Sequence, residues 1–108
     1  MIHADHYTYR VRWSGEDTGF LGTVAEFPAL SWFAETSRDA FTGINQLVAE
    51  VLADMELTGE TIPGPLSDRA YSGKFLVRIA PELHRNLAIE AAEQQVSLNR
   101  LISMRLAS

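Results

Sequence analysis

In the last third of the chain, the spacing of the apolar residues predicts one short strand and two short helices. Residues 74–79 alternate in polarity, which predicts a strand with Phe75, Val77 and Ile79 on one face. Pro81 suits the first position of a helix, and Ser97 suits the cap of a second helix. A single strand leaves its backbone groups unpaired and its apolar face uncovered. Residues 71–108 therefore need a partner, and a second copy of the chain is the simplest one.

Two copies of this segment would form a two-stranded antiparallel ribbon. Four helices would close over Phe75, Val77 and Ile79, which we expect to form the dimer core. The other face of the ribbon would display Lys74, Leu76 and Arg78 twice, related by a two-fold axis. A two-stranded ribbon fits the major groove, where Arg and Lys bind guanine and an apolar side chain contacts the thymine methyl group. The pattern therefore predicts that Lys74, Leu76 and Arg78 contact DNA bases.

The start of the second predicted helix offers a phosphate site. Free backbone amides and the positive end of the helix dipole lie at Ser97 and the residues that follow it. We expect Ser97 and Asn99 to contact a DNA phosphate, which positions the protein without reading sequence.

The first two thirds of the chain predict a small α+β domain. Residues 7–13 alternate as a strand with Tyr7, Tyr9, Val11 and Trp13 on its buried face. A polar turn over residues 14–19 leads to a second, antiparallel strand over 20–25, and residues 31–35 fit a third strand. Apolar residues then recur at helical spacing from an N-cap at Thr36 or Ser37 to Gly59. We predict a three-stranded antiparallel sheet with one helix in residues 1–70, ahead of the second domain in residues 71–108.

Charge is divided unevenly between these two domains. Residues 1–70 hold four basic and eleven acidic residues, a net charge of −7. Residues 71–108 hold five basic and three acidic residues, a net charge of +2. An acidic domain suits a basic protein partner, and a basic domain suits phosphates.

The last third resembles the ribbon-helix-helix repressors over about residues 73–107. The resemblance lies in residues 74–79, in Ala80-Pro81-Glu82-Leu83 and in residues 96–102. It implies that the outward strand residues Lys74, Leu76 and Arg78 read bases and that Ser97 with Asn99 clamps phosphate. A glycine often precedes the second helix in that family, where this chain has Gln95 and Val96.

Over nearly the whole chain, the sequence is similar to HicB-type antitoxins. The last third carries the most specific part, in residues 75–84, 88–92 and 97–102; earlier residues agree at Gly22 and Val24, at Glu26-Phe27-Pro28 and at Ala40 and Ile44. The resemblance implies an N-terminal domain with part of the ribonuclease H fold. It also implies an antitoxin that neutralises a small basic RNA-cleaving toxin and represses its own operon on operator DNA.

The oligomer is expected to be at least a dimer, and the sequence leaves a tetramer open. Trp32 and Phe33 are adjacent and so face opposite sides of a strand, and one of them is expected to be exposed as a toxin or dimer contact. A second hypothesis is a stand-alone repressor whose N-terminal domain senses a ligand or only oligomerises.

An enzyme is the third and least favoured hypothesis. Metal-dependent phosphodiester cleavage needs convergent carboxylates, and residues 7–13 contain none. We expect no cofactor and no metal site, because the chain has no cysteine and His3 and His6 lack a third ligand. No apolar run approaches the roughly 20 residues of a membrane span, and the N-terminus lacks the layout of a signal peptide. The sequence therefore predicts a cytoplasmic protein with no membrane partner.

Overall fold

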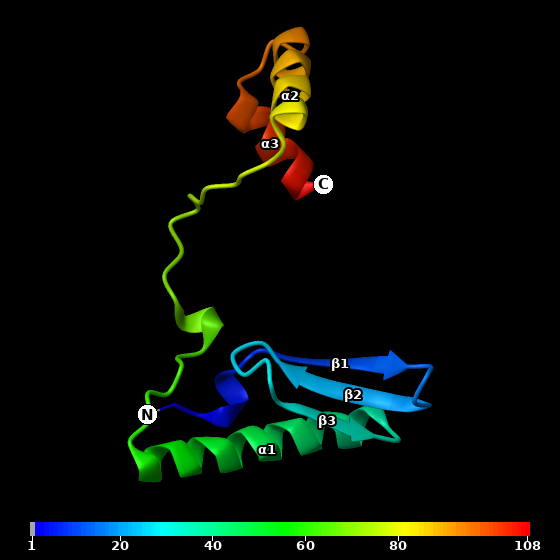
Figure 1. The fold of residues 1–108 in the computed structure, drawn as a ribbon, viewed down its shortest axis with the longest axis vertical. Helices are drawn as coiled ribbons and strands as arrows, with labels where there is room; N and C mark the ends of the chain where they lie inside the picture. The colour runs from blue at the N-terminus through cyan, green and yellow to red at the C-terminus, as the bar shows by residue number, and fades with distance from the viewer. Residues whose placement is uncertain (1) are drawn as a thin grey trace. The chain divides into compact units, whose positions relative to one another are not determined.

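The computed structural model describes residues 2–108 and confirms an α+β fold with a small antiparallel sheet and three α-helices (Figure 1). The chain divides into two units, Met1–Tyr71 and Ser72–Ser108. The first unit contains the sheet and the long helix, and the second contains the two shorter helices. Each unit is described by itself.

The sheet of the first unit has three antiparallel strands in the order β1-β2-β3. They are β1 (Tyr9–Ser14), β2 (Gly19–Val24) and β3 (Ser31–Ala34), preceded by a 3₁₀ turn, η1 (Ala4–His6). The register pairs Val11 with Gly22 and Gly22 with Trp32, so these three residues share one face of the sheet. The three strands predicted from the sequence are therefore present, although the first begins at Tyr9 instead of residue 7.

The long helix α1 (Ser37–Thr58) begins and ends at residues that the sequence predicts. The Thr36 side chain accepts a hydrogen bond from the Asp39 amide at 3.1 Å, which makes Thr36 the N-cap. Gly59 ends the helix with φ of 74°, a left-handed conformation that favours glycine.

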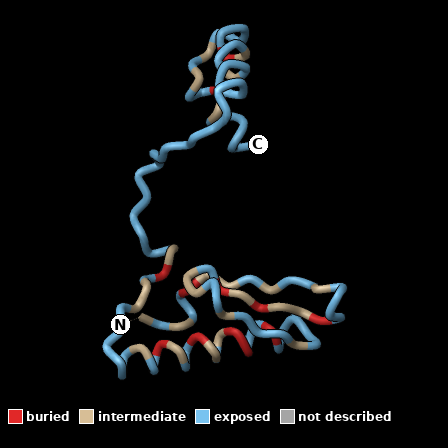
Figure 2. Tube along the Cα trace, in the orientation of Figure 1, coloured by how far each residue is buried: buried red, intermediate tan, exposed pale blue. Residues whose placement is uncertain are grey.

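The helix α1 packs on the sheet against β2 and β3, and the core of the first unit lies between the helix and the sheet (Figure 2). The buried residues of this core are Tyr7, Val24, Ile44, Val48 and Leu52. Gly22 permits the close approach, because a Cβ there would lie 2.8 Å from the carbonyl oxygen of Ala40. The prediction that Trp13 is buried is wrong: its side chain is 57% exposed, near the end of β1, where it forms an edge-to-face pair with Phe20.

Trp32 and Phe33 lie on opposite faces of β3, and both are partly exposed. Trp32 is 44% exposed and packs its indole against Gly43, where a Cβ would lie 2.0 Å from the indole Nε1. Phe33 is 46% exposed and covers Gly19 on the other face. The prediction that one of the two is exposed therefore understates the result, since each presents nearly half of its surface.

Glu26 ties the segment after α1 back to the sheet. Its carboxylate accepts hydrogen bonds from the amide of Thr8 at 3.0 Å and from the amide of Leu66 at 2.9 Å. The Tyr7 hydroxyl donates to the carbonyl oxygen of Pro63 at 2.6 Å beside it. Burial alone would raise the pKa of Glu26, but the hydrogen bonds from Leu66 and Thr8 outweigh it and lower the pKa. The segment around residues 63–66 is thus held by charge-assisted hydrogen bonds as well as by packing.

The second unit contains α2 (Pro81–Glu93) and α3 (Leu98–Ala107), which pack together around Ala91 and Leu101. Between them, Gln95 has φ of 58°. The amide of Val96 donates to the Ala91 carbonyl and that of Gln95 to the Ala92 carbonyl, which is the Schellman end of a helix. Gln95 therefore occupies a left-handed position that usually holds glycine.

Glu26→Gln tests how far the Glu26 carboxylate stabilises the fold by joining Thr8 to Leu66. We expect a free energy of unfolding lower by about 1–2 kcal/mol at about pH 7, because a neutral amide accepts the hydrogen bonds from the Thr8 amide, the Thr8 hydroxyl and the Leu66 amide more weakly than a carboxylate does. The folded-state pKa of Glu26 is lowered, so its contribution is present above the unfolded-state pKa and lost as pH falls through the folded-state value. Urea unfolding should therefore show a smaller deficit at about pH 3.

The matched control is Glu35→Gln, since Glu35 is exposed and makes no hydrogen bond in the part of the chain that the structure describes. It should change the free energy of unfolding by less than about 0.5 kcal/mol at either pH. A Glu26→Gln deficit that is the same at both pH values would contradict the ionic role.

Candidate dimer and DNA interface

The segment before α2 forms neither a helix nor a strand in the single chain. Residues 74–80 are exposed. Among the described residues, their backbone amides make one hydrogen bond, in which the Lys74 amide donates to the Ser72 hydroxyl oxygen at 3.1 Å. A strand exists only when a neighbouring strand satisfies its backbone groups. The expected strand at residues 74–79 is therefore absent from one chain taken alone, and the ribbon stays a prediction.

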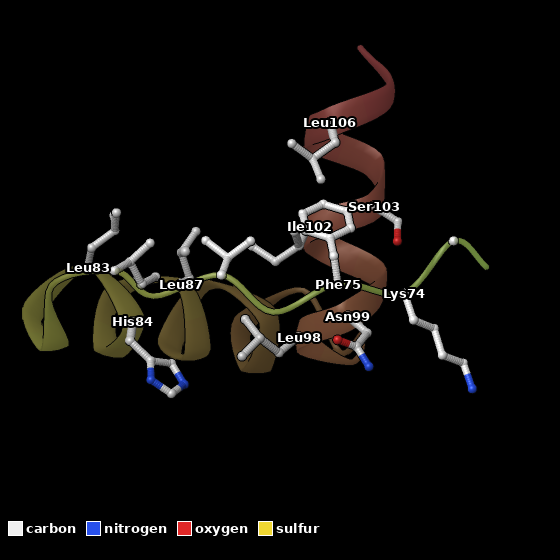
Figure 3. Close-up of a pocket in the computed structure, with 13 residues that line it drawn as sticks. Lys74, Phe75, Leu83, His84, Leu87, Leu98, Asn99, Ile102, Ser103 and Leu106 are labelled. Atoms are coloured by element: carbon white, nitrogen blue, oxygen red, sulfur yellow. The ribbon is translucent and has the colours of Figure 1, made fainter. Parts of the chain in front are cut away.

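An open apolar groove of about 770 Å³ lies between this segment and the two helices (Figure 3). The apolar side chains that line it are Phe75, Val77, Ile79, Leu83, Leu87, Leu98, Ile102 and Leu106. In Figure 3, Leu83 and Leu87 point to the same side of α2, while His84 points away from them. The structure thus brings the three predicted core residues Phe75, Val77 and Ile79 together with the apolar faces of α2 and α3.

This groove is not covered by the chain itself. Phe75 is 76% exposed and Val77 is 60% exposed. Contiguous exposed apolar surface of this kind marks an interaction site, because burying such side chains stabilises an assembly by about 1.5–3 kcal/mol each.

The three predicted base-contact residues lie in the same segment and are all exposed. Leu76 is 82% exposed, and neither Leu76 nor Arg78 lines the groove. Lys74 does line the groove, at the start of the segment 74–80. Figure 3 shows the Lys74 side chain directed away from the apolar side chains. The alternation predicted from the sequence therefore separates Leu76 and Arg78 from the groove side chains.

The predicted phosphate residues lie at the start of α3. Ser97 is its N-cap, and the Ser97 hydroxyl oxygen accepts from the amide of Arg100 at 3.0 Å. The amides of the first helical residues have no partner within the helix, and Asn99 is exposed beside them. Ser97 and Asn99 thus share a helix end that has the chemistry for an anion.

The C-terminal half of α1 carries an acidic surface in the other unit. Glu50, Asp54 and Glu56 are exposed, and the last turn of the helix contains no basic residue. Carboxylates near the C-terminal end of a helix are unfavourable because the dipole is negative there, and Glu50 and Asp54 repel each other four residues apart. Helix stability does not account for this arrangement.

Two further features of the structure concern other classes of site. Among residues 2–108, no three histidine or carboxylate side chains lie close enough together to hold a metal ion. None of the described helices combines the length and the apolar character that a bilayer span requires.

Sequence reasoning missed the role of Glu26 and the conformation of Gln95. Glu26 joins residues far apart in sequence, Thr8 and Leu66, and no local pattern marks it. Gln95 stands where glycine is common in ribbon-helix-helix repressors, and that departure was the available signal for its positive φ.

The model of the HicB family matches residues 56–106, which covers the end of α1, the segment after it and both short helices. This part of the chain is therefore similar to the HicB family. No curated protein and no solved structure matches the chain.

Val77→Asp tests whether the groove is covered by a second copy. We expect the variant to sediment as a monomer where the unmodified chain sediments as a dimer or larger, because a carboxylate would be buried without a partner in the interface. The helical signal of α1 should persist in circular dichroism, since the core that α1 forms lies within the first unit.

Leu57→Asp is the control for a general effect of replacing an exposed apolar residue with a charge. Leu57 is exposed at the end of α1, outside the groove. If Val77→Asp leaves the sedimentation coefficient unchanged, the groove does not hold a second copy.

Proposed function

We propose that the protein is an antitoxin that binds a small basic RNA-cleaving toxin and represses its own operon as a ribbon-helix-helix dimer. The observation that carries this is the uncovered groove of Phe75, Val77 and Ile79 beside exposed Lys74, Leu76 and Arg78, within the region that the HicB family model matches. The match is consistent with an antitoxin of a toxin–antitoxin system.

The proposed dimer satisfies the backbone and the apolar groove at the same time. Two copies of residues 74–79 pair antiparallel, so the amides and carbonyls left free in one chain bond to the second chain. Phe75, Val77 and Ile79 then lie under the helices of both copies. Pairing in this way turns Lys74, Leu76 and Arg78 outward, as a ribbon that binds the major groove requires.

The proposed DNA contacts divide into two kinds. Lys74, Leu76 and Arg78 face the base edges, where Arg and Lys bind guanine and leucine contacts a thymine methyl group. Ser97 and Asn99 at the start of α3 bind a backbone phosphate and fix the register on the duplex. The net charge of +2 in residues 71–108 favours the association.

The acidic unit supports the toxin-binding part of the proposal. Residues 1–70 have a net charge of −7, and Glu50, Asp54 and Glu56 lie exposed on α1. A basic toxin would relieve the repulsion between Glu50 and Asp54 on binding. The partly exposed Trp32 and Phe33 are candidates for an apolar anchor in that contact or in a tetramer.

We further propose that this unit acts by binding and not as an enzyme. A partial ribonuclease H fold, as the sequence resemblance implies, suits the order of β1, β2, β3 and α1. Cleavage on such a fold needs carboxylates that converge on metal, and the strand β1 carries arginines at its polar positions, Arg10 and Arg12.

Lys74→Ala/Arg78→Ala tests the DNA contact. On a duplex from the region upstream of the gene, we expect affinity to fall at least about a hundredfold, because each base contact contributes about 1–3 kcal/mol. The dimer should persist, since neither side chain is part of the apolar core. Fluorescence anisotropy measures the affinity, and sedimentation measures the dimer.

Arg38→Ala/Arg69→Ala removes the same charge from the first unit, which the proposal does not place on DNA, and should change this affinity less than about threefold, because these charges then contribute only screened attraction. Equal losses in the two double variants would mean that net charge and not the ribbon carries DNA binding.

Co-expression tests the antitoxin role. We expect the small basic protein encoded beside this gene to arrest growth alone, and the arrest to be relieved when this chain is present and purifies with it. A neighbour that is harmless, or toxic but not relieved, would leave a stand-alone repressor whose first unit binds a ligand or only oligomerises.

Removing two negative charges from α1 tests whether this helix contacts the toxin. Glu50→Gln/Asp54→Asn should weaken co-purification while stabilising the helix by a few tenths of a kcal/mol, since it removes an unfavourable pair. Glu16→Gln/Asp68→Asn is the matched control, at two exposed carboxylates that accept no hydrogen bond from the described residues, and it should leave co-purification unchanged. Equal retention of the toxin by both variants would place the contact away from α1.

A further inference from the structure

The strand β1 leaves one side of its backbone open at the edge of the sheet. The amide of Ala25 donates to the carbonyl of Thr8 at 2.9 Å, which makes these two residues a hydrogen-bonded pair, and the β1–β2 register continues from it without a bulge. Hydrogen-bonded and non-hydrogen-bonded pairs alternate in an antiparallel ladder. The N–H and C=O groups of Tyr9, Val11 and Trp13 therefore point away from β2, toward the open edge.

The side of this edge nearest α1 is apolar. Tyr9, Val11 and Trp13 face the helix side of the sheet, because Val11 shares a face with Gly22. Phe41 of α1 meets Tyr9 edge to face at 5.7 Å and is 47% exposed. With Trp13 also exposed, apolar surface borders the backbone groups that are left unpaired.

The opposite side of the same edge is basic. Arg10 and Arg12 are exposed there, and they pair across the strands with Thr23 and Leu21, neither of which is acidic. They are two of the four basic residues in residues 1–70, among eleven acidic ones. Neither arginine forms an ion pair with any described residue.

A second copy of β1 does not suit this edge. Two β1 strands that pair with their helices on one side would place the arginines of both copies together on the other. If Val11 pairs with Val11 of the second copy in an antiparallel register, Arg10 lies opposite Arg12 of that copy. If the register shifts by two residues, Arg10 lies opposite Arg10 of the second copy, or Arg12 opposite Arg12. Like charges directly opposite are destabilising. The arginines therefore disfavour self-pairing and favour a strand that carries carboxylates.

We infer that the open edge of β1 binds an extended segment of another protein in which apolar and acidic residues alternate. The backbone of Tyr9, Val11 and Trp13 supplies the hydrogen bonds, as in other cases of strand addition. The apolar residues of the segment lie against Trp13 and Phe41, and its carboxylates lie opposite Arg10 and Arg12. This surface is separate from the acidic face of α1, and the inference does not depend on the antitoxin role.

The test uses the full chain and two seven-residue peptides. One alternates valine with glutamate, and the other alternates valine with lysine. We expect the glutamate peptide to bind at least about tenfold more tightly, because two or three cross-strand pairs change from attraction to repulsion. Amide chemical shifts should move most at Tyr9, Val11 and Trp13. Equal affinities, no binding of either peptide, or shifts centred elsewhere would overturn the inference.

Charge reversal provides the decisive variant. Arg10→Glu/Arg12→Glu should invert the preference so that the lysine peptide binds more tightly, whereas Arg38→Glu/Arg69→Glu, with the same change in net charge, should keep the original order. If the two double variants behave alike, only the overall charge of the unit matters and the inference fails.

Val11→Pro separates backbone pairing from side-chain contact. Its lost N–H points to the open edge, and proline is tolerated on an edge strand when its N–H side faces solvent. We expect at least about tenfold weaker binding of the glutamate peptide with the dispersed amide spectrum retained. Undiminished binding in a folded Val11→Pro chain would mean that strand addition is wrong. If Val11→Pro does not fold, the result of the charge reversal at Arg10 and Arg12 decides whether the inference holds.

Discussion

The apolar groove of the second unit is the constraint on which the assembly depends. A unit of two short helices buries only Ala91 and Leu101 within itself. Phe75, Val77 and Ile79 remain at its surface, together with backbone groups that no neighbour satisfies. Small units of this size reach stability through a partner. The same partner that covers the groove would order the segment that carries Lys74, Leu76 and Arg78, so dimerisation and DNA recognition are coupled in this proposal.

The first unit forms its own hydrophobic core, so its surfaces remain available to partners. The close approach at Gly22 lets α1 cover one face of the sheet, and Glu26 secures the segment that follows α1. With the core complete, the unit still presents an acidic helix surface and a basic, apolar strand edge. These two surfaces have opposite charge, so they suit different partners or different parts of one partner.

Most elements could be predicted because their causes are local. Thr36, Gly59, Pro81 and Ser97 mark helix ends through their own side chains or backbone freedom, and all four lie at those ends. Period-two alternation predicted β1, and β2 and β3 lie in the two further segments that the sequence predicted as strands after a polar turn. The error at Trp13 has a different origin. Alternation gives the face on which a side chain lies, but burial depends on whether another element reaches that far along the strand.

By itself, the sequence determined the order of the elements, the division of charge and the alternation that separates Leu76 and Arg78 from Phe75, Val77 and Ile79. These follow from residue types at fixed spacing, which backbone geometry converts directly into faces and ends. Only the tertiary structure decided that Glu26 links Thr8 to Leu66, that Trp32 and Phe33 are both half exposed, and that β1 is an open edge with two unpaired arginines. Each of these depends on contacts between residues distant in sequence, and local patterns carry no information about such distances.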